Sequence, residues 1–403
     1  MTSQQYLHSL QLLMEQHQLH ISLAEHFYNL LKMKEIKCLK AVEPLTNTRY
    51  VDDIYGGADE LAEAIQVALD TINMCAAGCF PLAKWASNST KLLSQVAPVE
   101  TQEDTPREIG DTTVKVLGLT WNPAQDKFQF GNSLPEASQT TKRTILSEIA
   151  SLFDPLGFLA PIIVRAKMFM QMLWLQNFDW DATLSPLLLQ ERNLFRDELH
   201  QISKIQISRW NHVKTGVSIE LHGFSHASQL AMAAVVYLKV TDATGSSNIS
   251  LVCAKTQVAS LKPISIPRME LNAAVLLAQL VLYVKKVLKL ENVPIFLWTD
   301  SAVFSTWIRN NPARWKVYIR NRVTKIQESL PSVNWDFVPG KLNPADCASR
   351  GLTAAKLEQH SLWWTGPKWL SQSEENWPSF DITTQTVSHL EERPSLGATH
   401  ATG

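Results

Sequence analysis

The sequence has little cysteine, no long apolar stretch and almost no net charge. Among its 403 residues are five cysteines, and 37 basic residues nearly balance 38 acidic ones, so the formal net charge is −1. A globally basic nucleic-acid coat protein is therefore disfavoured, although a local basic patch remains compatible with these numbers. With 45% apolar and 19% charged residues, the composition is that of a globular protein of two or three domains.

The cysteines do not form a disulfide framework, because their number is odd and they are scattered, which indicates a reducing environment. Cys75 and Cys79 are the one close pair, and no histidine pair follows them at zinc-finger spacing. We therefore interpret both as buried thiols on one helix.

No segment resembles a membrane span or a secretory signal. The longest apolar run, residues 273–284, contains Gln279, and it is well short of the roughly 20 residues that a span requires. The N-terminus has no basic segment followed by an apolar one. The sequence predicts an intracellular chain, cytoplasmic or nuclear, without membrane contact.

The N-terminal half predicts helices around a small hairpin. Apolar and aromatic residues flank Asp52 and Asp53 and are closed by Gly56-Gly57, which predicts a β-hairpin with the acids at its tip. The other expected elements are a helical start at 1–40, a helix at 59–76, a strand-like run at 80–85, a connector at 98–112, strands at 114–121 and 128–130, a helical region at 142–177 that Pro155, Gly157 and Pro161 interrupt, and a helix at 186–202.

From residue 217 the pattern becomes α/β. Expected strands lie at 217–224, 232–240, 249–256, 294–299 and 333–338, and expected helices at 268–289, 301–309 and from Pro344. Three successive strands followed by alternating helices and strands predict one mixed sheet flanked by helices. The segment after Gly351 is rich in tryptophan, and we expect disorder from about residue 384.

Asp52 and Asp53 form the first candidate site. Adjacent carboxylates on a tight hairpin repel each other unless a cation or water separates them, and hard oxygen donors suit Mg²⁺. In two-metal phosphoryl transfer, such a pair holds the ions that activate the attacking hydroxyl and stabilise the leaving group. The alternative is a solvated turn, which the surrounding pattern makes less favoured.

Three further acids lie at the ends of expected elements: Glu270 near the start of a long helix, Asp300 after an apolar strand, and Asp346 after Pro344. If they converge, they form a ligand set for two divalent cations. Taken singly, Asp300-Ser301 is also a helix cap, Asp346 a first-turn acid, and Glu270 a solvated residue. The set of three favours the metal site.

A basic stretch runs from Arg309 to Lys325, with Trp315 and Tyr318 between its cations and no acid. Cations neutralise phosphates and aromatic rings stack on bases, so the stretch is compatible with nucleic-acid binding. A solvated helix with two aromatic side chains turned to the core explains it equally well.

Several motifs, in order, resemble the Pol polyprotein of BEL/Pao-type retrotransposons. Residues 50–53 (YVDD) are similar to the YxDD motif of reverse transcriptases, and residues 79–88 to the primer-grip region that follows it. The remaining similar segments are 116–122 and 153–161 in the middle region, 222–228, 267–271, 298–301 and 343–346 in the ribonuclease H part, and 362–367 just after it.

The resemblance implies an α/β chain with an α+β palm remnant, a connection region and a ribonuclease H-like mixed sheet flanked by helices. The implied divisions are a helical segment of unclear match at 1–45, a partial palm at 46–97, a connection at 98–212, a ribonuclease H-like domain at 213–352, and a tryptophan-rich segment and tail at 353–403. The implied chemistry is RNA-templated DNA synthesis and hydrolysis of the RNA strand of an RNA–DNA hybrid, with Mg²⁺ or Mn²⁺. Template-primer nucleic acid and other parts of the polyprotein are the implied partners.

The resemblance also implies residue roles. Asp52 and Asp53 match two of three polymerase carboxylates that hold the metals. Glu270, Asp300 and Asp346 match three of four ribonuclease H carboxylates. The residues that we expect to contact nucleic acid are Lys84 and Trp85 near the primer end, and Arg314, Lys316, Arg320 and Arg322 in the basic stretch.

Two departures from the family pattern lead us to expect impaired catalysis. Only 49 residues precede Tyr50, and they do not resemble the fingers segment that carries the first palm acid. In the ribonuclease H part, His226 stands where the family has the first aspartate. Imidazole ligates Zn²⁺ but is a poor donor to Mg²⁺. The sequence alone favours drift in a copy no longer selected for catalysis over a change of metal.

Two other functions remain open. The ribonuclease H-like sheet is alternatively a non-catalytic platform for hybrid or duplex nucleic acid, which the basic stretch favours. An aspartic peptidase is a minor alternative suggested by Asp300-Ser301, but Ala302 stands where such enzymes need glycine.

Overall fold

The computed structural model describes residues 39–50, 52–96, 113–131, 139–377 and 391–393. The connector expected at 98–112 and most of the expected helical start and polar tail lie outside these residues. Within them, a main hydrophobic core extends from Leu119 to Leu370. None of the described helices is both long and apolar enough to cross a bilayer.

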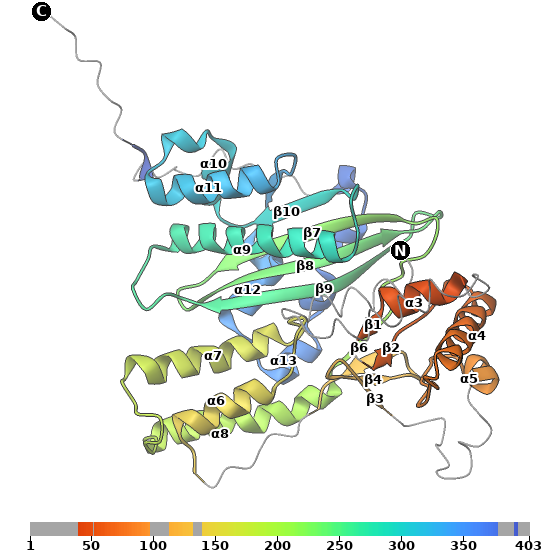
Figure 1. Cartoon of the computed structure of the whole chain (residues 1–403). Coiled ribbons are helices and arrows are strands. Elements are labelled where there is room, and N and C mark those ends of the chain that lie inside the picture. Colours follow the sequence, from red (N-terminus) through yellow and green to blue (C-terminus); the bar gives the residue numbers. More distant parts are fainter. Residues whose placement is uncertain (1–38, 51, 97–112, 132–138, 378–390, 394–403) are drawn as a thin grey trace, which may run out of the picture.

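The centre of the molecule is a five-stranded mixed sheet (Figure 1). Its order is β11-β10-β7-β8-β9; β7, β8 and β9 are antiparallel, whereas β10 and β11 run parallel to β7. Strand β8, between β7 and β9, is buried along almost its whole length, as expected for an apolar run covered on both faces. This architecture confirms the predicted α/β sheet. The strands are β7 (Ser218–Ala227), β8 (Ala231–Thr241), β9 (Ser247–Val258), β10 (Ile295–Thr299) and β11 (Trp335–Phe337).

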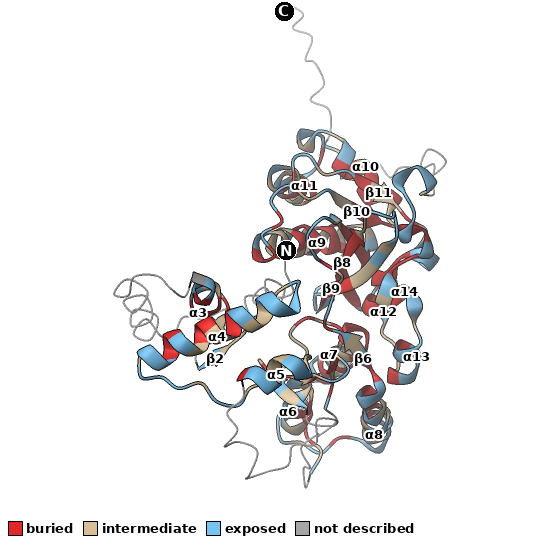
Figure 2. Ribbon diagram, turned by 90° about the vertical axis from the view of Figure 1, so that its right-hand side faces the viewer, coloured by how far each residue is buried: buried red, intermediate tan, exposed pale blue. Residues whose placement is uncertain are grey.

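Helices cover both faces of this sheet (Figure 2). Helix α9 (Ile266–Val287) packs on one face, close to Gly223 of β7, where a Cβ would lie 2.8 Å from Leu277 and from Leu297. The short helices α12 (Pro344–Arg350) and α14 (Ser361–Thr365) lie on the other face, and α13 (Ala354–Glu358), between them in the sequence, packs against the helical layer described below. Helices α10 (Ala302–Arg309) and α11 (Val317–Ser329) lie beside β10 and α9.

The tryptophan-rich segment is part of this core. The Trp363 ring is fully buried and its Nε1 donates to the carbonyl of Phe158 at 2.9 Å. The hydroxyl of Tyr237 in β8 donates to the Trp363 carbonyl at 2.7 Å. Two 3₁₀ turns, η6 (Lys368–Ser371) and η7 (Glu374–Asn376), follow, and Trp369 stacks at an angle against Trp298 of β10.

A helical layer connects to the free edge of β9. It contains α6 (Lys142–Ser151), α7 (Ala160–Leu175), α8 (Pro186–Leu199) and η3 (His200–Lys204), which confirms the expected helices and their interruption between 151 and 160. Gly157 in that interruption has φ +75°, and a Cβ there would lie 2.0 Å from the Ala254 carbonyl oxygen. Only glycine therefore allows this loop to approach β9 so closely.

A four-stranded antiparallel sheet lies next to this layer. Its order is β3-β4-β5-β6, with β3 (Val114–Val116), β4 (Leu119–Asn122), β5 (Lys127–Gln129) and β6 (Gln206–Ser208). The prediction of one strand over 114–121 was wrong, because Leu117 and Gly118 have positive φ and turn the chain back in a two-residue hairpin.

The N-terminal part contains the predicted hairpin: β1 (Arg49–Tyr50) pairs with β2 (Asp53–Ile54), and Tyr50 opposes Asp53. The short helices η1 (Leu39–Ala41) and α3 (Val42–Thr46) precede it, and α4 (Leu61–Ala77) and α5 (Thr90–Val96) follow it.

Two expectations for this part were wrong. Cys75 is buried within α4, but Cys79 is exposed because the helix ends at Ala77. The run at 80–85 is not a strand. Cys79 and Lys84 have φ values of 63° and 58°, which interrupt an extended backbone.

Candidate functional site

The pairing of β7 with β10 brings His226 and Asp300 together. Thr299 pairs with Ser225 in a parallel register, so the next residue of each strand lies at the same end of the sheet. Ser301 then begins α10, its Oγ accepting from the Phe304 backbone N–H at 3.2 Å. This confirms the helix cap, and Asp300 lies directly before it.

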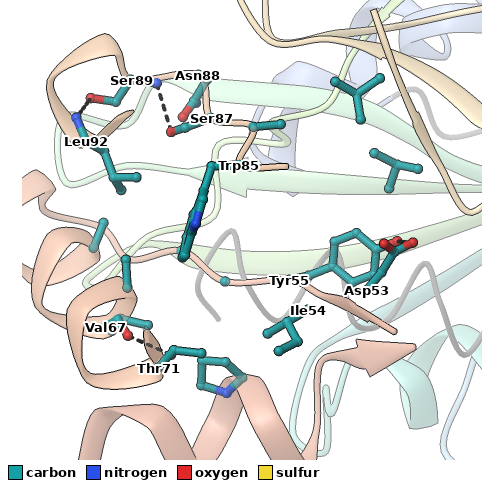
Figure 3. A pocket seen from close by; sticks show the side chains of 18 of the residues that line it. Asp53, Ile54, Tyr55, Val67, Thr71, Trp85, Ser87, Asn88, Ser89 and Leu92 are labelled. Carbon is teal, nitrogen blue, oxygen red and sulfur yellow. Dashed lines mark hydrogen bonds between the residues drawn. The ribbon is translucent and has the colours of Figure 1, made fainter. Parts of the chain in front are cut away.

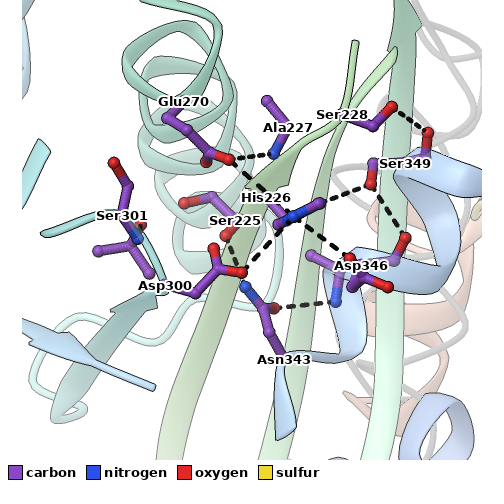
Figure 4. A network of polar contacts seen from close by, with 12 residues as sticks. Ser225, His226, Ala227, Ser228, Glu270, Asp300, Ser301, Asn343, Asp346 and Ser349 are labelled. Atoms are coloured by element: carbon purple, nitrogen blue, oxygen red, sulfur yellow. Dashed lines mark hydrogen bonds and ion pairs between the residues drawn. The ribbon is translucent and has the colours of Figure 1, made fainter. Parts of the chain in front are cut away.

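Glu270 and Asp346 reach the same end of the sheet from two helices. Glu270 is in the first turns of α9, and its Oε1 accepts from the backbone N–H of Ala227 at 3.0 Å. Asp346 is in the first turn of α12. Asn343 caps this helix, because its Oδ1 accepts from the backbone N–H of Ala345 at 3.0 Å. The three acids predicted to converge therefore do so, around the end of β7 (Figure 4).

His226 lies among these acids (Figure 4). Its Nε2 is 3.3 Å from Asp346 Oδ1, 3.5 Å from Asp300 Oδ2 and 4.0 Å from Glu270 Oε1. Donor atoms of His226, Glu270 and Asp300 lie within 4.8 Å of one another, the one such group of three or more acids, histidines or cysteines found in the described parts of the chain. His226 and Glu270 are buried, at 5% and 6% exposure.

Burial dominates the electrostatics of the group. It raises the pKa of Glu270 to about 9, with Asp300 and Asp346 adding to the effect. Burial also raises the pKa of Asp300. Burial lowers the pKa of His226 despite the opposing pull of Asp300 and Asp346. The lowered pKa favours the neutral ring. A neutral imidazole forms no ion pair, so no charge attraction holds Nε2 to the three carboxyl oxygens.

The donor set fits only in part the magnesium pair that the resemblance implies. Glu270 Oε2 and Asp300 Oδ1 are buried without a hydrogen-bond partner, which suits a bound cation. However, His226 places an imidazole nitrogen where hard oxygen donors are needed, and it removes one negative charge. The residues fit a cation, but they do not fit a pair of Mg²⁺ ions.

Two residues that the sequence analysis missed hold this arrangement. The Asn343 amide donates to the Ser225 carbonyl at 2.9 Å, which fixes α12 to β7. Ser349 Oγ lies 2.6 Å from His226 Nδ1. Ser349 follows Asp346 by three residues, one helical turn, and this spacing was the available signal.

Asp52 and Asp53 lie elsewhere, at the tip of the β1–β2 hairpin, and both are exposed. The Tyr55 hydroxyl donates to Asp53 Oδ2 at 3.3 Å. Burial and the adjacent Asp53 raise the pKa of Tyr55. Within the described residues, no third acid, histidine or cysteine completes a metal-binding group with this pair.

A cavity of about 520 Å³ lies beside this hairpin, between the N-terminal part and the four-stranded sheet. Asp52, Asp53, Lys84 and Trp85 all line it, and Figure 3 shows Trp85 between the Asp53–Tyr55 end and the Ser87–Ser89 end. The structure therefore brings together the four palm-region residues selected from the sequence.

The basic stretch forms the turn η4 (Pro312–Arg314) and helix α11. Trp315 is fully buried, and its Nε1 donates to the Trp307 carbonyl at 3.2 Å. The guanidinium of Arg322 lies 3.6 Å from the centre of the Tyr318 ring and donates to Asn272 at 2.7 Å. The side chains of Trp315, Tyr318 and Arg322 therefore have structural roles. The sequence left this choice open, and part of the stretch follows the structural alternative.

Residues 391–393 lie against the basic stretch. Arg268 Nε donates to Glu391 Oε1 at 2.8 Å, and the Lys316 N–H donates to the Glu391 carbonyl at 2.9 Å. A single β-bridge joins Trp315 and Glu392. The sequence analysis did not predict this contact.

Comparison with known proteins finds a family model that matches part of the chain. Residues 141–301 match the model of the Pao retrotransposon-like RNaseH-like domain, which confirms the resemblance drawn from the sequence motifs. The match begins in α6 and includes His226, Glu270 and Asp300. The domain boundaries drawn from the sequence remain predictions. A search of curated proteins finds no match.

Two solved structures are similar in part. One is the foamy viral protease-reverse transcriptase in complex with RNA/DNA hybrid, with 13% identity and a TM-score of 0.39; the match covers 74% of this chain and 37% of that one. The other is the same viral protein in complex with dsDNA, with 12% identity and a TM-score of 0.21, covering 78% and 57%. The chain thus spans less than two thirds of either.

Proposed function

Because residues 141–301 match the model of the Pao retrotransposon-like RNaseH-like domain, we propose that this chain is part of a retrotransposon polyprotein with a ribonuclease H-like domain that binds an RNA–DNA hybrid. We further propose that it hydrolyses the RNA strand poorly with Mg²⁺. The observation that carries this second statement is the position of His226, with its Nε2 3.3–4.0 Å from three carboxylates.

The roles of the remaining side chains follow from that position. Asp300 and Glu270 are the buried oxygen donors for a cation. Asp346 is more exposed, and Arg350 donates to its Oδ1 at 2.6 Å. An aspartate at 226 would supply the missing oxygen donor and negative charge, which Mg²⁺ requires for tight binding.

Hybrid cleavage tests the proposal. We expect the His226→Asp variant to cleave a labelled RNA–DNA hybrid at least about tenfold faster than the natural chain in Mg²⁺, since losing even a residue that only orients a ligand costs about 10- to 100-fold. His226→Asn is the matched control, because it has nearly the same shape as aspartate without the charge. Equal rates for the natural chain and His226→Asp would contradict the proposal.

We assign Asp52 and Asp53 the role of palm carboxylates. We also propose that Lys84 and Trp85 contact a template-primer. The cavity that all four line supports this assignment. Trp85→Ala is expected to weaken template-primer binding more than hybrid binding at the ribonuclease H-like domain. An equal effect on both ligands would argue against it.

A nucleic-acid platform without catalysis is the second candidate. The basic stretch favours it, because Arg320, Arg322 and Lys325 lie on α11, beside α9, which carries Glu270. The affinity of such a platform for a hybrid falls steeply with salt. Binding that is absent, or insensitive to salt, would remove this candidate.

A further inference from the structure

The tautomer of His226 follows from its hydrogen bonds. Ser349 Oγ donates its single proton to the carbonyl oxygen of Asp346 at 2.9 Å. It must therefore accept at its other contact, so His226 Nδ1 carries the proton of the 2.6 Å bond between them. With the proton on Nδ1, Nε2 is the ring nitrogen that remains free to bind a cation, and it faces the three acids.

The Nε2 lone pair and the oxygens of the three acids together form a set of ligands for a cation. A proton on Nε2 is one candidate, but charge-assisted N–H···O bonds are about 2.7–2.9 Å long. Here the nearest oxygen, on Asp346, is 3.3 Å away, and Nε2 forms no hydrogen bond with any described residue. Nε2 is therefore not hydrogen-bonded to any one of the three acids.

The spacing suits ligands arranged around one metal ion. Two ligands at about 2.0–2.2 Å from a tetrahedral ion are about 3.3–3.6 Å apart. Nε2 lies within this range of Asp300 Oδ2, at 3.5 Å, and slightly farther from Glu270 Oε1, at 4.0 Å. Glu270 Oε2 and Asp300 Oδ1 are buried without partners. A histidine ligand that donates its other ring N–H to a fixed acceptor is the usual second-shell arrangement of metal sites.

We propose that His226 Nε2, Glu270 and Asp300 bind a single transition-metal ion of the Zn²⁺ type in place of a magnesium pair. Two carboxylates and a neutral imidazole balance the charge of one divalent ion, and this nitrogen and oxygen donor set suits Zn²⁺. Asp346 lies next to these residues, with its Oδ1 3.3 Å from Nε2 and bonded to Arg350 at 2.6 Å. Ser349 is a positioning residue that orients the ring. This inference rests on the proposed function, because it concerns the same group of side chains.

Metal titration of the full chain tests it, with metal content and visible spectra as readouts. After dialysis against a chelator, we expect one Zn²⁺ per chain, and Co²⁺ in its place to give the absorption bands of a tetrahedral ion. His226→Asp is expected to weaken Zn²⁺ binding and to strengthen Mg²⁺ binding. Ser349→Ala is expected to weaken Zn²⁺ binding about 10- to 100-fold.

Ser305→Ala is the matched control, because Ser305 is a buried serine of α10 whose Oγ has no hydrogen-bond partner. It is expected to bind Zn²⁺ like the natural chain. No bound Zn²⁺, or Zn²⁺ binding unchanged in both His226→Asn and Ser349→Ala, would overturn the proposal. Because these readouts involve no nucleic acid, a chain that binds Zn²⁺ as expected but no hybrid would contradict the proposed function and leave the metal site standing.

Discussion

Glu392 lies against Arg314 at the start of the basic stretch, with its Oε1 2.9 Å from the Arg314 Nε. The N–H of Arg393 donates to the Arg314 carbonyl at 3.0 Å, so the backbone also holds this segment in place. Glu391 pairs with Arg268 in the same way. The carboxylates of Glu391 and Glu392 therefore neutralise two arginines that would otherwise be available to phosphates.

We therefore expect the double variant Glu391→Gln and Glu392→Gln to bind an RNA–DNA hybrid several-fold more tightly than the natural chain. Two released cations should steepen the dependence of log affinity on log salt by roughly two. Fluorescence anisotropy across a salt series measures both quantities. Glu374→Gln with Glu375→Gln, an exposed acidic pair in η7, is the control; the same gain in that variant would show a general charge effect.

Arg320 and Arg322 are expected to behave differently although both lie on α11. Arg322 stacks on Tyr318 and bonds to Asn272, so Arg322→Ala should lower the free energy of unfolding by about 1–2 kcal/mol. The Arg320 side chain makes no hydrogen bond or ion pair with a described residue. Arg320→Ala should therefore leave stability nearly unchanged and reduce the salt slope of hybrid binding by about one. Urea denaturation and binding on both variants check this; matching stability losses would contradict it.

Much of the ribonuclease H-like part was predictable because its strands are long and apolar. The run Ile295–Thr299 ends at Asp300, and a buried strand that ends at an acid places that acid at the edge of the sheet. The convergence of Asp300 with Glu270 and Asp346 could thus be expected before any coordinates. His226 was identified as the odd member by its place in a motif.

Other features depend on contacts that no local pattern encodes. Ser349 meets His226 across 123 residues of sequence, and neither residue is unusual in its own segment. Glu391 reaches Arg268 over a similar separation. Cys79 was placed on a helix because apolar periodicity does not reveal where a helix ends, and the positive φ at Leu117 divides a run that looks like one strand.

Asp154 makes the stability of the helical layer depend on pH. Its two oxygens accept from the N–H groups of Phe158 and Leu159 at 2.9 and 2.7 Å, at the start of α7, yet burial raises the pKa of its carboxyl to about 7. Between the unfolded pKa of about 4 and about 7, the folded chain keeps a proton that the unfolded chain has lost. The free energy of unfolding should therefore fall as the pH rises through this window.

Asp154→Asn removes this titration, so the stability of the natural chain relative to the variant should decline between about pH 4 and pH 7 and then level off. Urea denaturation over this range measures it. Asp179→Asn, at an exposed position, serves as the control. A difference between Asp154→Asn and the natural chain that does not change with pH would contradict the assignment.

Gly157 and Gly245 provide a matched test of the contact between the helical layer and the sheet. Both have positive φ, of +75° and +85°, but a Cβ at Gly157 would lie 2.0 Å from the Ala254 carbonyl, whereas a Cβ at Gly245 meets nothing within 4 Å. Gly245→Ala should cost only the backbone strain of about 1–2 kcal/mol. Gly157→Ala should cost clearly more, because the loop must also move away from β9. Equal losses in thermal unfolding would contradict the close approach.

The state of the His226 ring tests the account most directly. Nitrogen NMR of the chain labelled at histidine distinguishes a protonated from an unprotonated ring nitrogen. We predict that His226 carries its proton on Nδ1, that Nε2 is unprotonated at neutral pH, and that the Nε2 signal shifts on addition of Zn²⁺ but not of Mg²⁺ at the same concentration. A proton on Nε2, with no response to Zn²⁺, would contradict the account.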